Sequence, residues 1–471
     1  MKNIIYYKSP YFIKCILASV KGCLNNRKRY NKKYIKLYNI FIKNYNSEYE
    51  EVLIYQKEQL IKLLTECYLY SDFYKNRFLE KGFNISHINN EPFKVLASLP
   101  ILSKQERKSE VERIINKNPK RKTKEIGFTS GTTGTPTKNY LDEETSAVSF
   151  ALWNRFHYSI RLNKKDKHIR FSSNLVTEPK RNKPPFWVYN NSDSQLLMSV
   201  FHLKEDNLKY YIEKINSFKP VYLDGFPSAI YVLSEYINRK KIILSFKPFA
   251  VCTTAETLFD YQRKEIEKAF GCKVYNQYAS SEGSPFITEC KYGKMHVEED
   301  SGIFEFLDDN NQPVKSGQIG RMVVTSLRSW KTPLLRYDIL DYVEMDTDTK
   351  KCKCGSPFKY VKSVHGRAND MLWTFERGYV SGGVASALKN IKGIKQVQII
   401  QKKPNDIFIN IVKDKDYTDS SEIEIIENLK DRLGQNIGIR FNYVSNIEHN
   451  LSGKLKLLIR EFKVEDYIKS I

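Results

Sequence analysis

The sequence predicts an α/β protein with a large N-terminal domain and a small α+β domain at the C-terminal end. Helical and extended patterns alternate between residues 208 and 274, which is typical of a sheet with parallel strands. The chain has 471 residues, of which 41% are hydrophobic, as expected for a globular protein with a substantial core. A separate compact unit of about 100 residues follows residue 370, a normal size for a domain.

The N-terminal region is predicted to be helical. Residues 32–81 lack glycine and proline, and their apolar side chains recur at intervals of three and four, as shown by Ile54, Leu60, Leu63, Leu64 and Tyr68. The apolar stretch 11–24 is interrupted by Lys14 and Lys21, which argues against a signal peptide. We expect an amphipathic helix there, either docked on the body of the protein or lying on a membrane surface.

The middle of the chain predicts the α/β layers and then a β-rich subdomain. One helical face is made by Leu208, Tyr211, Ile212 and Ile215, and another by Ala229, Val232, Leu233 and Tyr236. Residues 221–223 form a short apolar run typical of a buried strand. A helix over 262–270 should end at Gly271, and a strand should follow from Val274. Residues 302–343 are β-rich, with turn signals at 308–311 and 315–317.

The C-terminal unit begins with a predicted hairpin. Apolar residues alternate on both sides of Pro404-Asn405-Asp406, at 397 and 399 and again at 407, 409 and 411. A helix should follow and end at Gly434, with a buried face formed by Ile423, Ile426, Leu429 and Leu433. Alternation at 439, 441 and 443 predicts another strand.

The composition of the chain excludes only a few classes of function. The net charge is +23, from 77 Lys and Arg against 54 Asp and Glu. Because the excess is spread along the chain, it predicts neither a nucleic-acid partner nor a charged tail. The sequence contains no run of about 18 apolar residues, so we expect no membrane-spanning helix. Eight scattered cysteines favour a reducing, cytoplasmic setting over a disulfide framework.

The loop Thr129–Lys138 reads Thr-Ser-Gly-Thr-Thr-Gly-Thr-Pro-Thr-Lys. Gly131 and Gly134 allow backbone N–H groups to converge on a ligand, and the hydroxyls of Ser130, Thr132 and Thr133 add donors. Such a loop can hold phosphate, although on its own it also fits a plain surface turn. It is not a Walker loop.

The loop resembles the phosphate-binding signature of the adenylate-forming superfamily. Within it, the chain is similar to the phenylacetate–CoA ligase-like branch and to its CapK-like capsular polysaccharide biosynthesis proteins. The resemblance covers about residues 90–460, because further motifs follow in the family's order: 221–228, 253–256, 278–283, 336–341, 366–370 and 452–454. It implies a helical region over 1–90 packed on an ATP- and acyl-binding domain over 91–367. It also implies a mobile C-terminal lid over 368–471 that carries a catalytic lysine.

The resemblance implies that ATP activates a carboxylic acid to an acyl-adenylate, with pyrophosphate leaving, before an acceptor takes the acyl group. The β- and γ-phosphates would be held by Thr129, Ser130, Gly131, Thr132, Thr133 and Gly134. Further ATP contacts would come from Thr254, Ala255, Glu256, Tyr278 and Ser281, the adenine lying beside Ala255, Glu256 and Tyr278. The acyl group would lie against Gly225, Phe226 and Pro227.

The charged residues complete the implied mechanism. Glu282 would hold Mg²⁺, a cation that prefers oxygen ligands, and Lys454 would stabilise charge at the α-phosphate. Asp341 would accept hydrogen bonds from the ribose, and Arg367 would contact ribose or phosphate. Rival assignments are Asp338 for Asp341 and Lys456 for Lys454, and Tyr278 fits a core position as well as an adenine contact.

The chain departs from the family pattern at three positions. Lys138 follows Pro-Thr instead of proline directly, which puts its reach to phosphate in doubt. Leu340 occupies the place of the glycine that usually precedes the ribose aspartate. Asn369 stands where the hinge usually has an acidic residue, and asparagine tolerates unusual backbone angles.

Four residues predict a structural zinc site. Cys290 and His296 form one pair and Cys352 and Cys354 another, each near an expected β turn. Three thiolates and an imidazole complete a tetrahedral zinc shell, and ordinary free cysteines are the alternative. The resemblance favours zinc, because parts of the branch carry similar Cys and His positions.

The sequence therefore predicts an AMP-forming ligase for an unidentified carboxylic acid in surface or capsular polysaccharide biosynthesis. The resemblance implies coenzyme A, an amine or a hydroxyl as acceptor, and a homodimer. The competing hypothesis is a relative that binds adenylates without turnover, as a scaffold in polysaccharide assembly.

Overall fold

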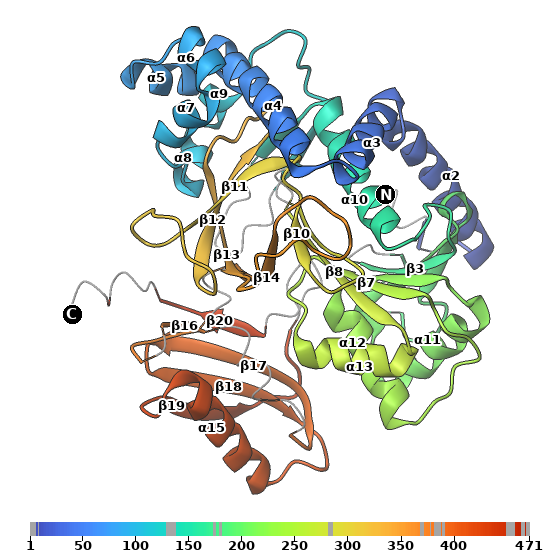
Figure 1. Ribbon diagram of the computed structural model, residues 1–471. Helices are drawn as coiled ribbons and strands as arrows, with labels where there is room; N and C mark the ends of the chain where they lie inside the picture. Colours follow the sequence, from blue (N-terminus) through green and yellow to red (C-terminus); the bar gives the residue numbers. More distant parts are fainter. Residues whose placement is uncertain are drawn as a thin grey trace.

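The computed structural model places most of the chain in two β-sheet units with helices around them (Figure 1). It describes residues 6–7, 9–128, 138–172, 176–178, 181–280, 286–367, 372–376, 378–380, 388, 391–448, 457–462 and 467. Among these residues, no helix is long and apolar enough to cross a membrane.

The predicted N-terminal helices are present as α2 (Tyr11–Arg29), α3 (Lys32–Tyr45), α4 (Tyr49–Tyr70) and α5 (Asp72–Glu80). The short helices that follow were not identified from residue spacing; they are α6 (Ile85–Asn90), α7 (Pro92–Ser98), α8 (Lys104–Ser109) and α9 (Val111–Ile114). The side chains of Leu60, Leu63 and Leu64 are buried on α4, as the three- and four-residue spacing predicts. Ile54 instead faces solvent and is 61% exposed.

One mixed sheet of twelve strands forms the body of the protein. Its order is β11-β12-β13-β14-β10-β9-β8-β7-β6-β3-β5-β4. The predicted parallel strands lie along β5, β3, β6, β7 and β8, and the remaining pairs are antiparallel. The first half in chain order comprises β3 (His168–Ser172), β4 (Trp187–Asn190), β5 (Gln195–Ser199), β6 (Tyr222–Gly225), β7 (Ala250–Thr254) and β8 (Lys273–Ala279).

Helices cover both faces of the parallel strands. The helices α11 (Glu205–Phe218), α12 (Pro227–Arg239) and α13 (Asp260–Phe270) pack on the face that presents Leu223. The helix α10 (Glu143–Ser159) packs on the opposite face, which presents Tyr222. Gly271 ends α13 with a φ of 64°, a left-handed conformation that glycine adopts readily.

The predicted β-rich subdomain is the antiparallel end of the same sheet. Its strands are β9 (Phe286–Glu289), β10 (Met295–Val297), β11 (Gly302–Leu307), β12 (Ile319–Ser326), β13 (Tyr337–Met345) and β14 (Tyr360–Arg367). Side chains of these strands share one core with α4, α5 and α7. The short hairpin β1 (Glu125–Phe128) and β2 (Lys138–Leu141) forms a separate sheet.

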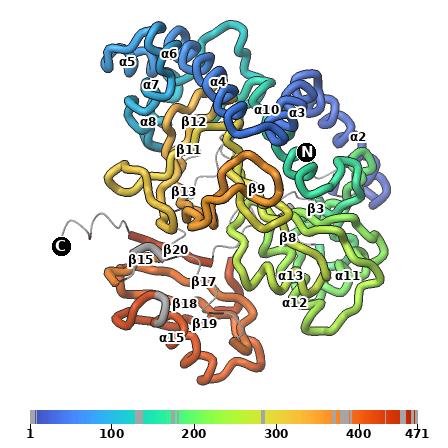
Figure 2. Tube along the Cα trace, viewed as in Figure 1, coloured from blue at the N-terminus to red at the C-terminus, as the bar shows by residue number. Residues whose placement is uncertain are grey.

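The C-terminal unit has the predicted hairpin, helix and strand. Its sheet has the order β19-β18-β17-β20, and the hairpin β15 and β16 lies beside it (Figure 2). The elements are β15 (Leu372–Thr374), β16 (Gly378–Val380), β17 (Ile394–Lys403), β18 (Asp406–Lys413), α15 (Asp419–Leu433), β19 (Gly438–Tyr443) and β20 (Leu458–Arg460).

The predicted buried face of α15 is wrong in part. Ile425, Leu429 and Leu433 are fully buried against the sheet, whereas Ile423 is 57% exposed. Spacing by four along this face excludes Ile423, which lies two positions and therefore about 200° from Ile425.

A buried charge cluster joins the N-terminal helices to the main sheet. The Arg155 guanidinium of α10 donates from Nη1 to Asp300 Oδ2 at 2.6 Å and from Nη2 to Asp300 Oδ1 at 2.9 Å. It also pairs with Glu298 and donates to the carbonyl of Phe41 on α3 at 3.1 Å. Because all three charged side chains are buried, each needs its partners in place.

Candidate active site

The predicted acyl and adenine segments follow neighbouring parallel strands. Gly225, Phe226 and Pro227 connect β6 to α12, and Thr254, Ala255 and Glu256 lie at the end of β7. Ligands of α/β sheets bind outside the carboxyl ends of such strands. The structure therefore brings these two segments to the edge where a ligand is expected.

Local contacts hold the two segments in place. The Glu256 carboxylate accepts a hydrogen bond from the backbone N–H of Ser228 at 3.1 Å, in the first turn of α12, where negative charge is favourable. Gly225 has a φ of +141°, and a Cβ there would lie 2.1 Å from the carbonyl oxygen of Phe171. Only glycine fits this position.

The predicted adenine aromatic and ribose carboxylate are in contact. The hydroxyl of Tyr278, on β8, donates a short hydrogen bond to Asp341 Oδ2, on β13. Asp341 is also the Cα partner of Arg367 across the β13–β14 ladder. Tyr278 is half-buried against the main core, so it has a packing contact as well as a polar one.

Asp338, the rival for the ribose role, has other partners. Its carboxylate pairs with Arg321 and accepts a hydrogen bond from the backbone N–H of Leu340 at 2.9 Å. Leu340 has a φ of +64°, the left-handed conformation in which glycine is the usual residue. These contacts favour Asp341 as the residue that meets a ribose.

The stem of the predicted phosphate loop is the β1–β2 hairpin. Phe128 and Lys138 are Cα partners at the end of the hairpin from which the loop extends, so Lys138 lies at the base of the loop. Arg107, which no sequence pattern singled out, is fully buried and donates to Asn139 Oδ1 and to the Tyr337 hydroxyl, both at 3.3 Å. Arg107 thus ties this stem to β13, the strand of Asp341.

Several predicted site residues lie outside the described residues. They are Thr129, Ser130, Gly131, Thr132, Thr133, Gly134, Ser281, Glu282 and Lys454, together with Lys456 and the hinge residue Asn369. Arg367 is described as the last residue of β14, without its side chain.

A charged pair beside the acyl segment was not predicted. Arg170 on β3 donates from Nη1 to Asp224 Oδ2 on β6 at 3.0 Å. Asp224 directly precedes Gly225 and is 1% exposed, and its Oδ1 atom has no hydrogen-bond partner among the described residues. The signal in the sequence was an aspartate inside the apolar run 221–226.

The four predicted zinc ligands form one cluster. Their ligand atoms all lie within 4.8 Å of one another. Cys290 and His296 flank the β9–β10 turn, and Cys352 and Cys354 lie in the loop before β14. The sheet brings the two pairs together although they are far apart in the sequence, because His296 and Tyr360 are Cα partners on the neighbouring strands β10 and β14.

The geometry of the cluster suits a tetrahedral metal. The Sγ atoms of Cys290 and Cys352 are 3.8 Å apart, the separation of about 3.8 Å expected for two thiolates on zinc. His296 Nε2 lies 3.3 Å from Cys354 Sγ, and its Nδ1 lies 2.8 Å from the carbonyl oxygen of Phe358. A hydrogen bond to that carbonyl leaves Nε2 available as a ligand.

The thiols of the cluster also interact electrostatically. A hydrogen bond from Cys354 lowers the pKa of the Cys290 thiol, and the same contact raises the pKa of Cys354. All eight cysteines of the chain are free thiols.

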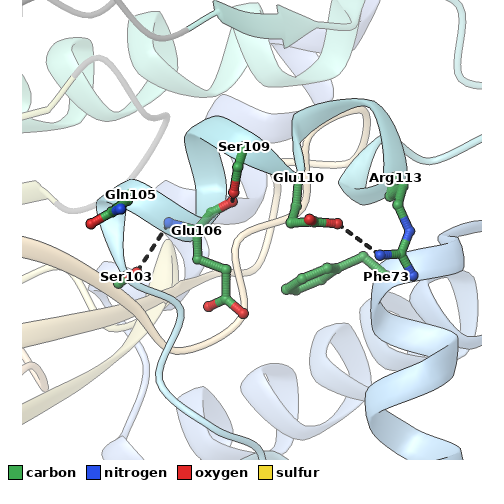
Figure 3. A pocket seen from close by; sticks show the side chains of 7 residues that line it. All are labelled: Phe73, Ser103, Gln105, Glu106, Ser109, Glu110 and Arg113. Carbon is green, nitrogen blue, oxygen red and sulfur yellow. Dashed lines mark hydrogen bonds and ion pairs between the residues drawn. The ribbon is translucent and has the colours of Figure 1, made fainter.

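A separate open pocket lies between α5, α8 and α9 (Figure 3). It has a volume of about 490 Å³ and is lined by Phe73, Ser103, Gln105, Glu106, Ser109, Glu110 and Arg113. Glu110 pairs with Arg113 at 2.8 Å, and Glu106 pairs with Arg77 at 2.6 Å. None of the predicted site residues lines this pocket, and we assign no ligand to it.

Known proteins resemble the chain at the level of both sequence and fold. Residues 372–461 match the family model of the CapK C-terminal domain. Protein CapK of Staphylococcus aureus is 32% identical over 477 residues, which cover 98% of this chain and 100% of that protein. A phenylacetate-coenzyme A ligase of Pseudomonas putida is 25% identical over 329 residues, 68% of this chain and 71% of that protein.

A solved structure shares the fold. The crystal structure of 2-hydroxyisobutyryl-CoA ligase in the postadenylation state, in complex with R3-HIB-AMP, has a TM-score of 0.66. The similarity covers 88% of this chain and 90% of that one, at 17% sequence identity. The predicted fold class, an adenylate-forming α/β domain followed by a small C-terminal domain, is confirmed. The chain belongs to the CapK family of the adenylate-forming superfamily, in the branch of the AMP-forming phenylacetate–CoA ligases.

Proposed function

We propose that this AMP-forming ligase activates a specific carboxylic acid with ATP and passes the acyl group to an acceptor in surface polysaccharide biosynthesis. The observation that carries the proposal is the contact between Tyr278 and Asp341, beside the loops that follow β6 and β7. It places an aromatic ring and a carboxylate at the sheet edge where a nucleoside is expected.

The reaction requires the protein to position the reactants and to stabilise charge on the phosphates, more than it requires a general base. Asp341 would accept hydrogen bonds from the ribose hydroxyls, and Tyr278 would hold that carboxylate and face the adenine. Residues 129–134 would donate hydrogen bonds to the phosphates. Mg²⁺, held by Glu282, would neutralise charge on the leaving pyrophosphate.

The acid would lie beside Gly225, Phe226 and Pro227. The Arg170–Asp224 pair borders this segment, so polar as well as apolar groups of the acid would find a partner there. Coenzyme A is the default acceptor, and an amine or hydroxyl of a sugar is the alternative for capsule assembly. The eight free cysteines support a reducing, cytoplasmic setting.

We also propose that Cys290, His296, Cys352 and Cys354 hold a structural zinc ion. The cluster provides the four ligands of a closed zinc shell, and a closed shell leaves no position for substrate. Its role would be to fasten the loop before β14 to the β9–β10 turn.

The proposed activity is tested by ATP–pyrophosphate exchange against a library of carboxylic and amino acids, with Mg²⁺ present. We expect exchange that depends on one acid or a small group of related acids. Glu282→Gln should lose most of this exchange while keeping its fold, because it removes the proposed metal carboxylate. Folded wild-type protein that binds ATP but exchanges with no acid would instead favour the scaffold hypothesis.

A further inference from the structure

The helix α2 packs on the protein through its polar side. Ser19 Oγ accepts a hydrogen bond from the backbone N–H of Asn191 at 3.0 Å, and Asn26 Nδ2 donates to Asp193 Oδ1 at 2.6 Å. Both partners belong to the short helix η1 (Asn191–Asp193), which follows the edge strand β4. The docked side of α2 is therefore hydrophilic.

The contact is close and specific. A Cβ at Gly22 would lie 2.3 Å from Ser192 Oγ and 2.4 Å from Asn190 Oδ1, so any larger residue would require these two side chains to move. Lys14 of α2 is also buried, and burial and the charge of Arg181 lower its pKa. These features fix which face of α2 points outward.

The outward face is apolar. Phe12, Ile16, Val20 and Leu24 follow one another at intervals of four, and their exposed fractions are 63%, 57%, 52% and 52%. Leu17 is exposed beside them. Contiguous exposed apolar patches mark interaction surfaces, and α2 lies at the periphery of the molecule (Figures 1 and 2).

The charged residues of the N-terminal segment that carries this stripe are all basic. Residues 1–46 contain eleven lysines and arginines and no aspartate or glutamate. Lys21, Arg27 and Lys28 are exposed on α2 itself, and long basic side chains at the border of an apolar face can reach anionic groups while their stems stay in apolar surroundings. A second copy of this chain would present the same cations and be repelled, whereas a negatively charged surface would be attracted.

We infer that α2 is an interfacial membrane anchor. Its apolar stripe inserts between the acyl chains of a bilayer, and Lys21, Arg27 and Lys28 contact anionic lipid headgroups. The helix lies in the plane of the interface, and the polar contacts with η1 hold the rest of the protein against the lipid surface. This inference concerns a surface separate from the proposed ligase site and does not depend on ligase activity.

The inference is tested by co-sedimentation of the full chain with vesicles. One set contains phosphatidylcholine alone and the other phosphatidylcholine with phosphatidylglycerol. The variant Ile16→Gln/Val20→Gln/Leu24→Gln removes the stripe and retains good helix formers. The matched control is Leu69→Gln/Leu79→Gln/Ile243→Gln, which replaces three apolar residues that are 53%, 53% and 92% exposed on other surfaces.

We expect the wild type and the control to bind the anionic vesicles, and binding to weaken as salt rises. The α2 variant should bind at least about tenfold more weakly with an unchanged thermal midpoint. Equal binding by the two triple variants would overturn the inference. So would a wild type that ignores both vesicles but forms a dimer which the α2 variant dissociates, because the stripe would then be a contact between copies.

Discussion

At the scale of single residues, Leu340 and Asp341 show how a departure from a family pattern is accommodated. Leu340 has a left-handed conformation at the position where the family usually has glycine, and its side chain is 36% exposed. A leucine is tolerated because its side chain does not need space in the core, although its backbone conformation costs about 1–2 kcal/mol. This conformation lies within β13, where its register with β12 shifts, directly before Asp341.

We expect Leu340→Gly to be more stable than Leu340→Ala by about 1 kcal/mol in free energy of unfolding. Both variants remove the same side-chain contacts, but only alanine keeps a Cβ in the left-handed conformation. Urea unfolding of the two proteins, measured under the same conditions, gives the difference. Equal stabilities would show that the backbone at residue 340 is not strained.

Asp341→Asn is expected to raise the KM for ATP in pyrophosphate exchange by about 10- to 100-fold, because hydrogen bonds to a charged group are the strong ones. Asp338→Asn is the matched control and should mainly reduce stability, since Asp338 is paired with Arg321. A larger effect on KM from Asp338→Asn than from Asp341→Asn would pass the ribose role to Asp338.

At the scale of elements, sequence patterns identified the long N-terminal helices, the helices of the parallel layer and several strands, but not the contacts between them. The spacing of Leu60, Leu63 and Leu64 correctly predicted the buried face of α4, and Gly271 correctly predicted the end of α13. The face of α15 was misjudged because Ile423, Ile425 and Ile426 are equally apolar. Which of the three is buried depends on the position of the sheet against which α15 packs.

The strand β14 links the cysteine cluster to the proposed nucleotide site. Its first residue, Tyr360, pairs with His296, and its last, Arg367, pairs with Asp341. A disturbance of the cluster is thus expected to reach the ribose site along one strand.

Protein purified without a His tag is expected to contain about one zinc ion per chain. Cys354→Ser should lose the metal and lower the thermal midpoint by several degrees, because metal binding stabilises the folded state. Cys272→Ser, outside the cluster, is the control and should retain the metal. Wild-type protein without stoichiometric zinc, as measured by elemental analysis, would rule out the site.

At the scale of the whole molecule, the links between distant segments were the part that the sequence did not reveal. Arg107 reaches Asn139 and Tyr337, and Arg155 reaches Asp300. No local pattern marks an arginine whose partner lies far along the chain. The proposed roles of residues 129–134, 282 and 454 came instead from ordered motifs, and they stay predictions.

The proposed lid movement makes a prediction about two half-reactions. If Lys454 meets the α-phosphate only when the C-terminal unit closes, Lys454→Ala should slow adenylation by about 10²–10³-fold. The same variant, supplied with pre-made acyl-adenylate, should transfer the acyl group at a normal rate. Pyrophosphate exchange and acyl-transfer assays measure the two steps separately.

Equal slowing of both steps would contradict domain alternation in this protein. An unchanged rate in both would move the role to Lys456 or Lys138. Thermal stability is expected to stay nearly constant in Lys454→Ala.

The position of α2 against β4 has a practical consequence for anyone who shortens the chain. The strand β4 is an edge of the twelve-stranded sheet, and unpaired edge strands are templates for aggregation. Deleting residues 1–30 to remove the exposed apolar stripe would also remove the helix that packs against this edge strand. Replacing the apolar residues of the stripe with polar ones, while keeping the helix, should therefore yield protein that aggregates less than protein from which the helix has been deleted.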